Sequence, residues 1–539
     1  MGWFRFELIL IGSLMFLLSC SGEFRANDTP QSQDGFSTPP PTNPPNPPGQ
    51  PQPPPPTPPS PPSGPAEPNC LKGLFNGNSG ALRQFDIPIA FNGRITFGDL
   101  TNDGFPDFVV AQRNRIAAYS LCGQKLWDVN VATNWDWKPH YFWNYTTFGV
   151  VGDADGDGKG EFLHIGGDWR TVYVRDGKTG QVKQQHQMPA IQEWMFVALA
   201  RRSGETNMAT RVVVLGPASG SNYGSIVDAV SFDIRGGSFK QEWSYRRNMK
   251  DGGRFIYPPP QIANLDGKGG DEVFHGTHAI SEGGQNIWLV NADAVAVGGI
   301  HALTIRDLDP SRAGLEAVFS AYGPHAGQPS LLGYGYSTGR NEMWRAYSPH
   351  SERHPHQHTT GDFFPEKPGL EVLARNANGY NHWFTDTKGK IARANWRVNP
   401  GWNGDGEYVH SIEWDGKAGT EVLYLERHVT QVNNNAVRSR FVVVSPINDQ
   451  RLTDAFGGGV MENPSGWTGY NSRGGFFNPY EAAGIAVDLI GDGREEVLTW
   501  GGGKITIFYN SGNENVPRRW TDLGYRSFKS INGPLYSPR

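Results

Sequence analysis

Acidic side chains recur at short spacing in glycine-rich stretches of this 539-residue chain. The fullest copy contains Asp153, Asp155, Asp157 and Glu161. Alternating acids in such a loop can turn their oxygens inward, and calcium takes about six to eight hard oxygen ligands. The spacing therefore predicts a Ca2+ site. The alternative is a turn in which the aspartates accept hydrogen bonds from backbone amides alone.

Two further copies of this pattern keep most of the acids, and we predict calcium there as well. Their candidate ligands are Asp99, Asp103 and Asp107, with Thr101 as an added oxygen, and Asp488, Asp492 and Glu496, with Ile490 in place of the middle acid. In other copies Lys268 or Lys417 occupies a position where an acid would bind. A cation at that position disfavours a metal ion.

A dense aromatic segment precedes the fullest acidic copy. It contains Trp135, Trp137, Tyr141 and Trp143, together with His140. Exposed Trp and Tyr rings can stack on sugar rings, whereas most aromatic side chains of a β protein pack in its core. We expect at least one of these rings to line a glycan-binding groove.

The acidic phrase is one part of a longer repeat, which is the element that must position these side chains. Copies begin near residues 99, 153, 264, 307, 362, 413 and 488, and a degenerate copy lies at 200–205. Between them lie alternating stretches such as 171–174 and 504–509, each followed by a glycine turn. A repeat of about 50 residues with four short strands is typical of a propeller blade. We predict an all-β fold, an eight-bladed β-propeller with FG-GAP-like calcium loops, with seven or nine blades as the alternatives.

The N-terminal residues have the composition of a secretion signal. An apolar run of roughly eleven residues ends in Leu17-Leu18-Ser19-Cys20, short for a bilayer-spanning helix and similar to a bacterial lipobox. From residue 39 to 68, 18 of 30 residues are proline, which favours an extended spacer. We predict a lipoprotein signal peptide over 1–19, a tether over 20–69 lipidated at Cys20, and a propeller over 70–539. The chain would then be a bacterial lipoprotein of the outer membrane or cell surface, attached to the membrane through its lipid alone.

Cysteine usage and charge limit the remaining options. Cys70 and Cys122 are left in the mature chain, and in an oxidising compartment they most simply form a disulfide. Lys and Arg number 48 against 53 Asp and Glu, for a net charge of −5. That balance argues against nucleic acid as a partner. We expect a monomer.

Two phrases closely resemble the rhamnogalacturonan lyases of polysaccharide lyase family 11. They are Asp-Leu-Asp-Pro-Ser-Arg-Ala-Gly-Leu-Glu at 307–316 and Asp-Leu-Ile-Gly-Asp-Gly-Arg-Glu-Glu-Val at 488–497. The ending, with Tyr525, Arg526, Asn532 and Tyr536, is similar to the C-terminal signature of that family. The resemblance spans roughly residues 85 to 539 and implies an eight-bladed propeller that degrades a polysaccharide.

The resemblance implies β-elimination at a uronic acid. A base removes the proton at C5, a cation neutralises the carboxylate, and an acid protonates the leaving oxygen. Where the family tends to have Arg, this chain has His354-Pro-His356-Gln-His358, and Tyr480 stands where a Lys is expected. The catalytic candidates are therefore His358, Tyr480, Tyr536 and His356, and His140 is a second candidate base. Arg306 and Arg375 are candidates for the carboxylate neutraliser, with interblade salt bridges as their alternative role.

These departures leave two hypotheses for function. The first is a lyase that cleaves an acidic, rhamnogalacturonan-like polysaccharide by β-elimination. The second is a non-catalytic glycan-binding or adhesive propeller on the same tether. The histidine-rich segment has two further interpretations, as structural histidines or as a surface metal site. The two hypotheses for function differ in whether a base and a neutraliser converge on one face of the ring.

Overall fold

The structure is a computed structural model of the chain. It describes residues 82–510, except for gaps at 92–93, 113, 133–148, 190–193, 195, 207, 218–225, 249–260, 276–277, 290–299, 322–328, 337–341, 351–354, 377–381, 397–408, 434–435, 454–455, 463–483, 490–493 and 502. The chain divides into two compact units, Met1–Pro62 and Ser63–Arg539. The predicted signal peptide, the lipidated Cys20 and the tether lie outside the described residues. Within them, no helix is long and apolar enough to cross a membrane.

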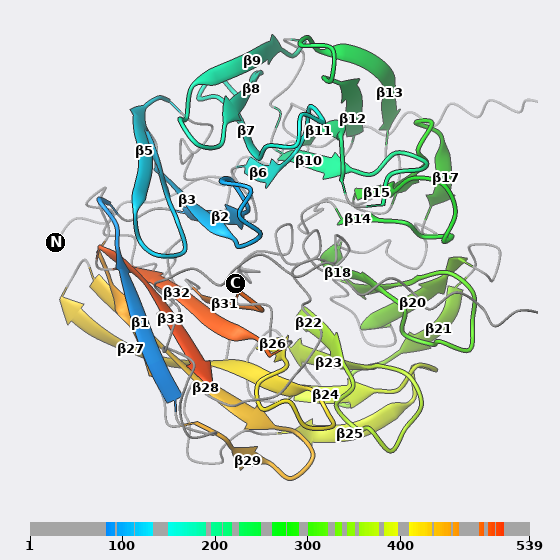
Figure 1. Cartoon of the computed structure of the whole chain (residues 1–539). Coiled ribbons are helices and arrows are strands. Elements are labelled where there is room, and N and C mark those ends of the chain that lie inside the picture. Colours follow the sequence, from blue (N-terminus) through cyan, green and yellow to red (C-terminus); the bar gives the residue numbers. More distant parts are fainter. Residues whose placement is uncertain are drawn as a thin grey trace, which may run out of the picture. The chain divides into compact units, whose positions relative to one another are not determined.

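The described residues form strands grouped into eight antiparallel sheets, which Figure 1 shows arranged as the blades of one ring. Blades 1 to 4 follow chain order from the innermost strand outward. Their strands are β2 (Arg94–Gly98), β3 (Asp107–Gln112), β4 (Arg115–Tyr119) and β5 (Lys125–Asn130); β6 (Gly149–Gly152), β7 (Glu161–Ile165), β8 (Thr171–Asp176) and β9 (Val182–Gln187); β10 (Phe196–Ala200), β11 (Arg211–Pro217), β12 (Ile226–Asp233) and β13 (Lys240–Asn248); and β14 (Gln261–Ala263), β15 (Glu272–His275), β16 (His278–Ile280) and β17 (Asn286–Leu289).

Blades 5 to 7 repeat this order, and blade 8 closes the ring. Their strands are β18 (Ile300–Arg306), β19 (Glu316–Ala321), β20 (Leu331–Gly335) and β21 (Glu342–Ala346); β22 (Pro355–Gly361), β23 (Glu371–Asn376), β24 (His382–Thr385) and β25 (Ile391–Trp396); β26 (Val409–Ile412), β27 (Glu421–Asn433), β28 (Ala436–Ser445), β29 (Gln450–Arg451) and β30 (Phe456–Glu462); and β31 (Gly484–Val487), β32 (Glu496–Gly501), β33 (Lys504–Asn510) and β1 (Leu82–Pro88). The all-β class and the eight blades predicted from the repeats are confirmed.

Ring closure joins the two ends of the described chain. β1 pairs antiparallel with β33, from Leu82 opposite Asn510 to Pro88 opposite Lys504. Asp86 reinforces this pairing, because its carboxylate accepts hydrogen bonds from Lys504 Nζ at 2.7 Å and Thr506 Oγ1 at 2.8 Å. The last blade is therefore completed by the first strand, a pairing between residues more than 400 positions apart in the sequence.

The hydrophobic core lies between neighbouring blades. Inner strands such as β7, β10 and β19 are buried along their full length because both faces of a blade pack on neighbours. Tryptophans near the start of the outer strands also cross these interfaces. Trp127, Trp243 and Trp344 lie against Gly180, Gly284 and Gly389 of the following blade, at distances that leave no room for a Cβ atom. These turn glycines also have positive φ, so other residues would be strained there.

The two edges of the ring differ in their connections. The eight A–B loops, defined here as the connections between the first and second strand of each blade, contain all copies of the acidic phrase, including the degenerate copy in blade 3. Neighbouring A–B loops are joined directly by backbone hydrogen bonds of 2.7–2.9 Å from Asp271 to Arg201, Leu315 to Leu265, Leu370 to Leu308, Thr420 to Asp362 and Glu495 to Glu413. The A–B loops therefore share one edge. Because strands alternate in direction, the last strand of each blade ends, and the first strand of the next blade begins, at the opposite edge.

Candidate functional site

A buried carboxylate opens the second strand of seven blades and holds its A–B loop in place. We call this side chain the latch carboxylate. It accepts a hydrogen bond of 2.7–3.1 Å from a backbone N–H seven or eight residues earlier. The pairs are Asp107 with Leu100, Glu161 with Ala154, Glu272 with Leu265, Glu316 with Leu308, Glu371 with Phe364, Glu421 with Trp414, and Glu496 with Leu489. The last acid of each phrase thus has a structural role in addition to any metal ligation.

Burial raises the pKa of most latch carboxylates. The pKa of Asp107 rises to about 7 because the group is buried and Asp103 adds negative charge. Burial likewise raises the pKa of Glu272 and Glu371 to about 7, with nearby aspartates adding to the effect. A cation among these acids would favour their charged forms. In the A–B loop of blade 2, the ammonium of Lys183 is such a cation.

The A–B loop of blade 2 gathers the fullest acidic set. Carboxylate oxygens of Asp153, Asp155 and Glu161 all lie within 4.8 Å of one another. Lys183, which comes from the outer strand β9, places its Nζ 2.6 Å from Asp155 Oδ2 and 2.8 Å from Glu161 Oε1. It also lies 3.1 Å from Asp157 Oδ2. Lys183 therefore contacts three of the four predicted ligands, and the acidic spacing alone gave no indication of this lysine.

This donor set fits calcium. The predicted ligands are hard oxygens from a short loop, and Asp153 Oδ1 is buried without a hydrogen-bond partner among the described residues. Asp153 Oδ2 accepts from the backbone N–H of Gly158 at 3.0 Å, so the loop is held in a turn. An oxygen that is both buried and unpartnered is the kind of atom a cation would satisfy. The ammonium of Lys183 shows that the loop accepts a positive charge.

The A–B loop of blade 1 is built in the same way. Asp99 accepts hydrogen bonds from the backbone N–H groups of Asp103 at 3.1 Å and Gly104 at 2.8 Å. Asp107 is the latch carboxylate and is 1% exposed. Thr101 Oγ1, the added oxygen predicted from sequence, is buried beside the carboxylate of Asp107 and lowers the pKa of that group. This loop therefore places an added oxygen next to its acids but contains no inserted lysine.

The predicted loop of blade 8 is described in part. Asp488 is fully buried, and Glu496 is the latch carboxylate that accepts from Leu489 N at 2.7 Å. Asp492 lies outside the described residues. Calcium in this loop stays a prediction.

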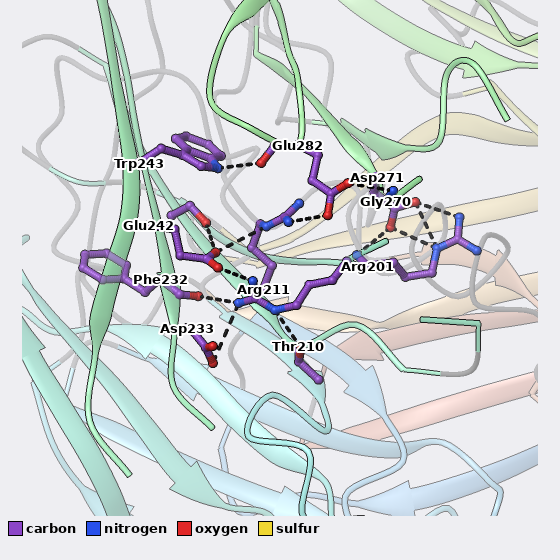
Figure 2. A network of polar contacts seen from close by, with 12 residues as sticks. Arg201, Thr210, Arg211, Phe232, Asp233, Glu242, Trp243, Gly270, Asp271 and Glu282 are labelled. Atoms are coloured by element: carbon purple, nitrogen blue, oxygen red, sulfur yellow. Dashed lines mark hydrogen bonds and ion pairs between the residues drawn. The ribbon is translucent and has the colours of Figure 1, made fainter. Parts of the chain in front are cut away.

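Blade 3 departs from the other seven because Arg211 occupies the latch position (Figure 2). Its Nη2 donates to Glu282 Oε1 of blade 4 at 2.7 Å, and its Nε lies 3.4 Å from Glu242 Oε2. Arg202 binds Glu242 as well, and Arg201 binds Asp271 of blade 4 at 2.7 Å. The acidic loop is replaced here by an arginine-rich one. The degenerate copy at 200–205, with two arginines and a single acid, is the sequence signal for this change.

The catalytic candidate His358 is buried between blades 5 and 6. It is on β22, is 1% exposed, and its Nδ1 is 2.6 Å from Ser320 Oγ of blade 5. Burial lowers the pKa of His358 to about 3, so its imidazole stays neutral. The neighbouring Gln357 points to the other side and accepts from Val409 N of blade 7 at 3.2 Å. This placement gives His358 an interblade packing contact and withholds the exposure that a base needs.

The two candidate arginines lie at opposite edges of the ring. Arg306 ends β18 beside the A–B loop of blade 5, where its Nη1 donates to Thr360 O of blade 6 at 3.1 Å. Arg375 lies near the far end of β23, opposite His382 on β24, and is 1% exposed. Burial lowers the pKa of His382 to about 3, and the charges of Arg375 and His350 contribute. Because of this separation, Arg306 and Arg375 cannot both face one substrate carboxylate.

The remaining candidates fall outside what the structure describes. They are Trp135, Trp137, His140, Tyr141, Trp143, Tyr480 and Tyr536, and the side chain of His356. The chain order nevertheless assigns the aromatic segment to the connection between blades 1 and 2 and Tyr480 to that between blades 7 and 8. The strands that flank these two connections end and begin at the edge opposite the A–B loops. Cys122 is disulfide-bonded, and its predicted partner Cys70 lies outside the described residues.

Comparisons with known proteins agree with this architecture. The family model for the C-terminal domain of rhamnogalacturonan lyase family 11 matches residues 219–443, from blade 3 into blade 7. The rhamnogalacturonan exolyase YesX of Bacillus subtilis (strain 168) is 27% identical over 40% of this chain and 39% of its own length. The endolyase YesW of the same organism is 26% identical over 52% of this chain and 48% of its own. The alignments thus span less than half of these curated relatives.

The solved structures show the same fold. The crystal structure of the exotype lyase YesX superposes with a TM-score of 0.60 at 19% identity, covering 84% of this chain and 80% of that one. The structure of YesW gives 0.54 at 19% identity, with 85% and 78% covered. Fold and loops therefore define an eight-bladed propeller with acidic A–B loops. Within that class, the chain is a protein similar to the family 11 rhamnogalacturonan lyases, which confirms the resemblance seen in the sequence.

Proposed function

We propose that this protein is a polysaccharide lyase that cleaves a uronate-containing, rhamnogalacturonan-like polysaccharide by β-elimination. The observation that carries the proposal is the family 11 match over residues 219–443, on a ring with the fold of two solved rhamnogalacturonan lyases. Both curated relatives are named as lyases of this polysaccharide. The shared segment includes about half of the ring, from the third strand of blade 3 into blade 7.

The reaction would take place at the edge opposite the A–B loops. The strands on either side of the segments that contain Tyr480 and the aromatic cluster end and begin at that edge, and His356 is the second residue of β22, which also begins there. A base must reach the C5 proton and an acid the leaving oxygen. Because His358 is 1% exposed, we assign these proton transfers to His356, Tyr480 and Tyr536. Trp135, Trp137, Tyr141 and Trp143, with His140, would bind the sugar chain.

A positive group at the same edge would neutralise the uronate carboxylate. Arg375 belongs to this edge, whereas Arg306 belongs to the A–B edge. The buried guanidinium of Arg375 would act from below the surface, by placing positive charge under the bound carboxylate. This assigns Arg375 the electrostatic role and Arg306 the interblade contact with Thr360.

Calcium would have a structural role in this protein. Asp99, Asp103, Asp107 and Thr101 would hold one ion. Asp153, Asp155, Asp157 and Glu161 would hold another in place of the ammonium of Lys183. Bound calcium would supply positive charge to buried carboxylates and fix the A–B loops. Since these loops lie at the edge opposite the proposed active site, the ions would stabilise the ring rather than contact the substrate. The lipid anchor on Cys20 and the proline-rich tether would display the propeller at the bacterial outer membrane or cell surface.

The test is the ultraviolet absorbance of the unsaturated uronate product. The purified protein is incubated with rhamnogalacturonan, pectin, ulvan and alginate, with calcium and then with a chelator. We expect absorbance to rise on rhamnogalacturonan, and Tyr480→Phe to reduce the rate at least about a hundredfold. Tyr336→Phe is the matched control, because Tyr336 contacts Asp266 at the A–B edge and should leave the rate unchanged.

A different outcome would favour the second hypothesis. If the folded protein binds one of these glycans but no substrate yields product, the chain is a non-catalytic glycan-binding propeller. In that case the catalytic roles proposed for His356, Tyr480 and Tyr536 are wrong.

A further inference from the structure

One irregularity recurs in the outer hairpin of six blades. The pairing between the third and fourth strands skips one residue of the fourth strand, which we call the bulge residue. These are Leu126, Lys183, Glu242, Ile287, Met343 and Ala392 in blades 1 to 6. Four of the six are apolar and pack against the core. In these four blades the bulge residue therefore faces the hydrophobic core.

Blades 2 and 3 are the two of these six with a charged bulge residue. In blade 2, Lys183 reaches the latch carboxylate Glu161 at 2.8 Å. In blade 3, Glu242 reaches Arg211, which occupies the latch position, at 3.4 Å. The same two positions are therefore occupied by a charge pair of opposite polarity. Glu161 is fully buried, so the loss of its partner would expose a buried charge to repulsion from Asp155.

The ammonium of Lys183 lies where a central cation would lie. It contacts three carboxylates of the A–B loop of blade 2, at 2.6, 3.1 and 2.8 Å. Two of these acids, Asp155 and Glu161, also belong to the cluster whose oxygens converge within 4.8 Å. Asp153, the third member, keeps a buried oxygen without a hydrogen-bond partner among the described residues. The lysine thus satisfies part of the site and leaves one ligand unused.

We propose that Lys183 is the resident cation of the blade 2 loop, and that a calcium ion binds there only by displacing its ammonium. The two cations compete for the same oxygens of Asp155 and Glu161. The side chain of Lys183 has an exposed fraction of 24%, so it can leave the loop for solvent. This inference concerns metal binding and does not depend on the lyase activity.

Competition predicts that removing the ammonium strengthens calcium binding. If the loop is free of Lys183 in a tenth of molecules or fewer, Lys183→Leu should tighten calcium binding at this loop by about tenfold or more. Leucine is the choice because Leu126 occupies the same bulge position in blade 1. Calorimetric titration of the full protein with calcium should show one more tight site in Lys183→Leu than in the wild type.

Two variants make the test specific. Lys159→Leu removes a lysine that contacts Asp157 at 3.3 Å from an exposed position, and its titration should match the wild type. Asp155→Asn combined with Lys183→Leu should lose the added site. Thermal unfolding gives a second measurement, since Lys183→Leu should be destabilised in chelator and restored by calcium, whereas calcium should change the wild type less.

The proposal is overturned if Lys183→Leu binds calcium no more tightly than the wild type while remaining folded. It is also overturned if Lys159→Leu gains the same site, since that would indicate a general loss of positive charge. Destabilisation of Lys183→Leu that calcium does not reverse would show that the lysine is purely structural.

Discussion

Blades 2 and 3 are adjacent and share one strand order, but the charge pair between the latch position and the bulge residue has opposite polarity in the two blades. Blade 2 has an acid at the latch position and a lysine at the bulge, and blade 3 has Arg211 and Glu242 at those positions. The contacts of Lys183 remain within its own blade, whereas Arg211 also binds Glu282 of the next blade. The fold therefore determines where the charge pair lies, and the residue types at the latch and bulge positions determine its polarity. In blade 3 the reversed polarity additionally joins two blades.

The largest effect should follow from removal of Arg211. Arg211→Met leaves Glu242 and Glu282 without their shared partner in a site where Arg211 is 5% exposed. Glu242 keeps Arg202, and the side chains of Glu242 and Glu282 have exposed fractions of 24% and 30%, so we expect a loss of about 2–3 kcal/mol, smaller than for a fully buried pair. Urea unfolding should show this decrease, and Arg211→Lys should recover part of it.

Arg235→Met is the matched control for this prediction. Arg235 pairs with Asp233 in the same blade, but its side chain has an exposed fraction of 47%. Exposed pairs contribute about 1 kcal/mol or less. Equal losses for Arg211→Met and Arg235→Met would contradict the importance given to the reversed pair.

A smaller effect is expected in a blade that keeps the acidic latch. Glu421→Ala leaves the buried N–H of Trp414 without the oxygen that accepts its hydrogen bond at 2.9 Å. An unsatisfied buried donor costs about 1–3 kcal/mol. The measurement is again the free energy of unfolding in urea, compared with Asp415→Ala in the same loop. Asp415 pairs with Lys417, whose side chain has an exposed fraction of 77%, so this control should lose less.

The sequence predicted the features that depend on local spacing. The acidic phrases placed the A–B loops and, by their number, the eight blades, because each phrase directly precedes the second strand of its blade. The contacts of Lys183 could not be predicted in this way. It lies 22 positions after Glu161 and reaches it only because a bulge turns its side chain inward.

The candidate site was less predictable because exposure depends on interblade packing. His358 looked like a base from its histidine-rich surroundings, yet its contact is Ser320, 38 positions earlier on another blade. Arg306 and Arg375 were equally good candidates for the carboxylate neutraliser in the sequence. The direction of their strands places them at opposite edges of the ring. The closing pair β1 and β33 likewise joins segments that have no shared sequence signal.

The smallest expected effect concerns the pH dependence of one latch carboxylate. Burial raises the pKa of Glu316 above the ordinary value of 4.5, and Asp307 and Asp309 add to the shift. Just above pH 4.5 the folded state therefore keeps a proton that the unfolded chain has released. Folding takes up that proton, so the contribution of Glu316 to stability is greatest below this window and falls as the pH rises through it.

Glu316→Gln removes this titration and keeps an oxygen that can accept from Leu308 N. The variant should resemble the wild type near pH 4.5 and become slightly more stable relative to it as the pH rises. The measurement is urea unfolding at several pH values in chelator, with Glu366→Gln, at an exposed position of the next A–B loop, expected to run parallel to the wild type. A Glu316→Gln profile parallel to the wild type would mean that Glu316 is already charged in the folded ring, which would require a cation beside its unpartnered Oε1. The blade 5 loop would then hold a cation of its own, as the blade 2 loop holds the ammonium of Lys183. The two blades would no longer differ in this respect.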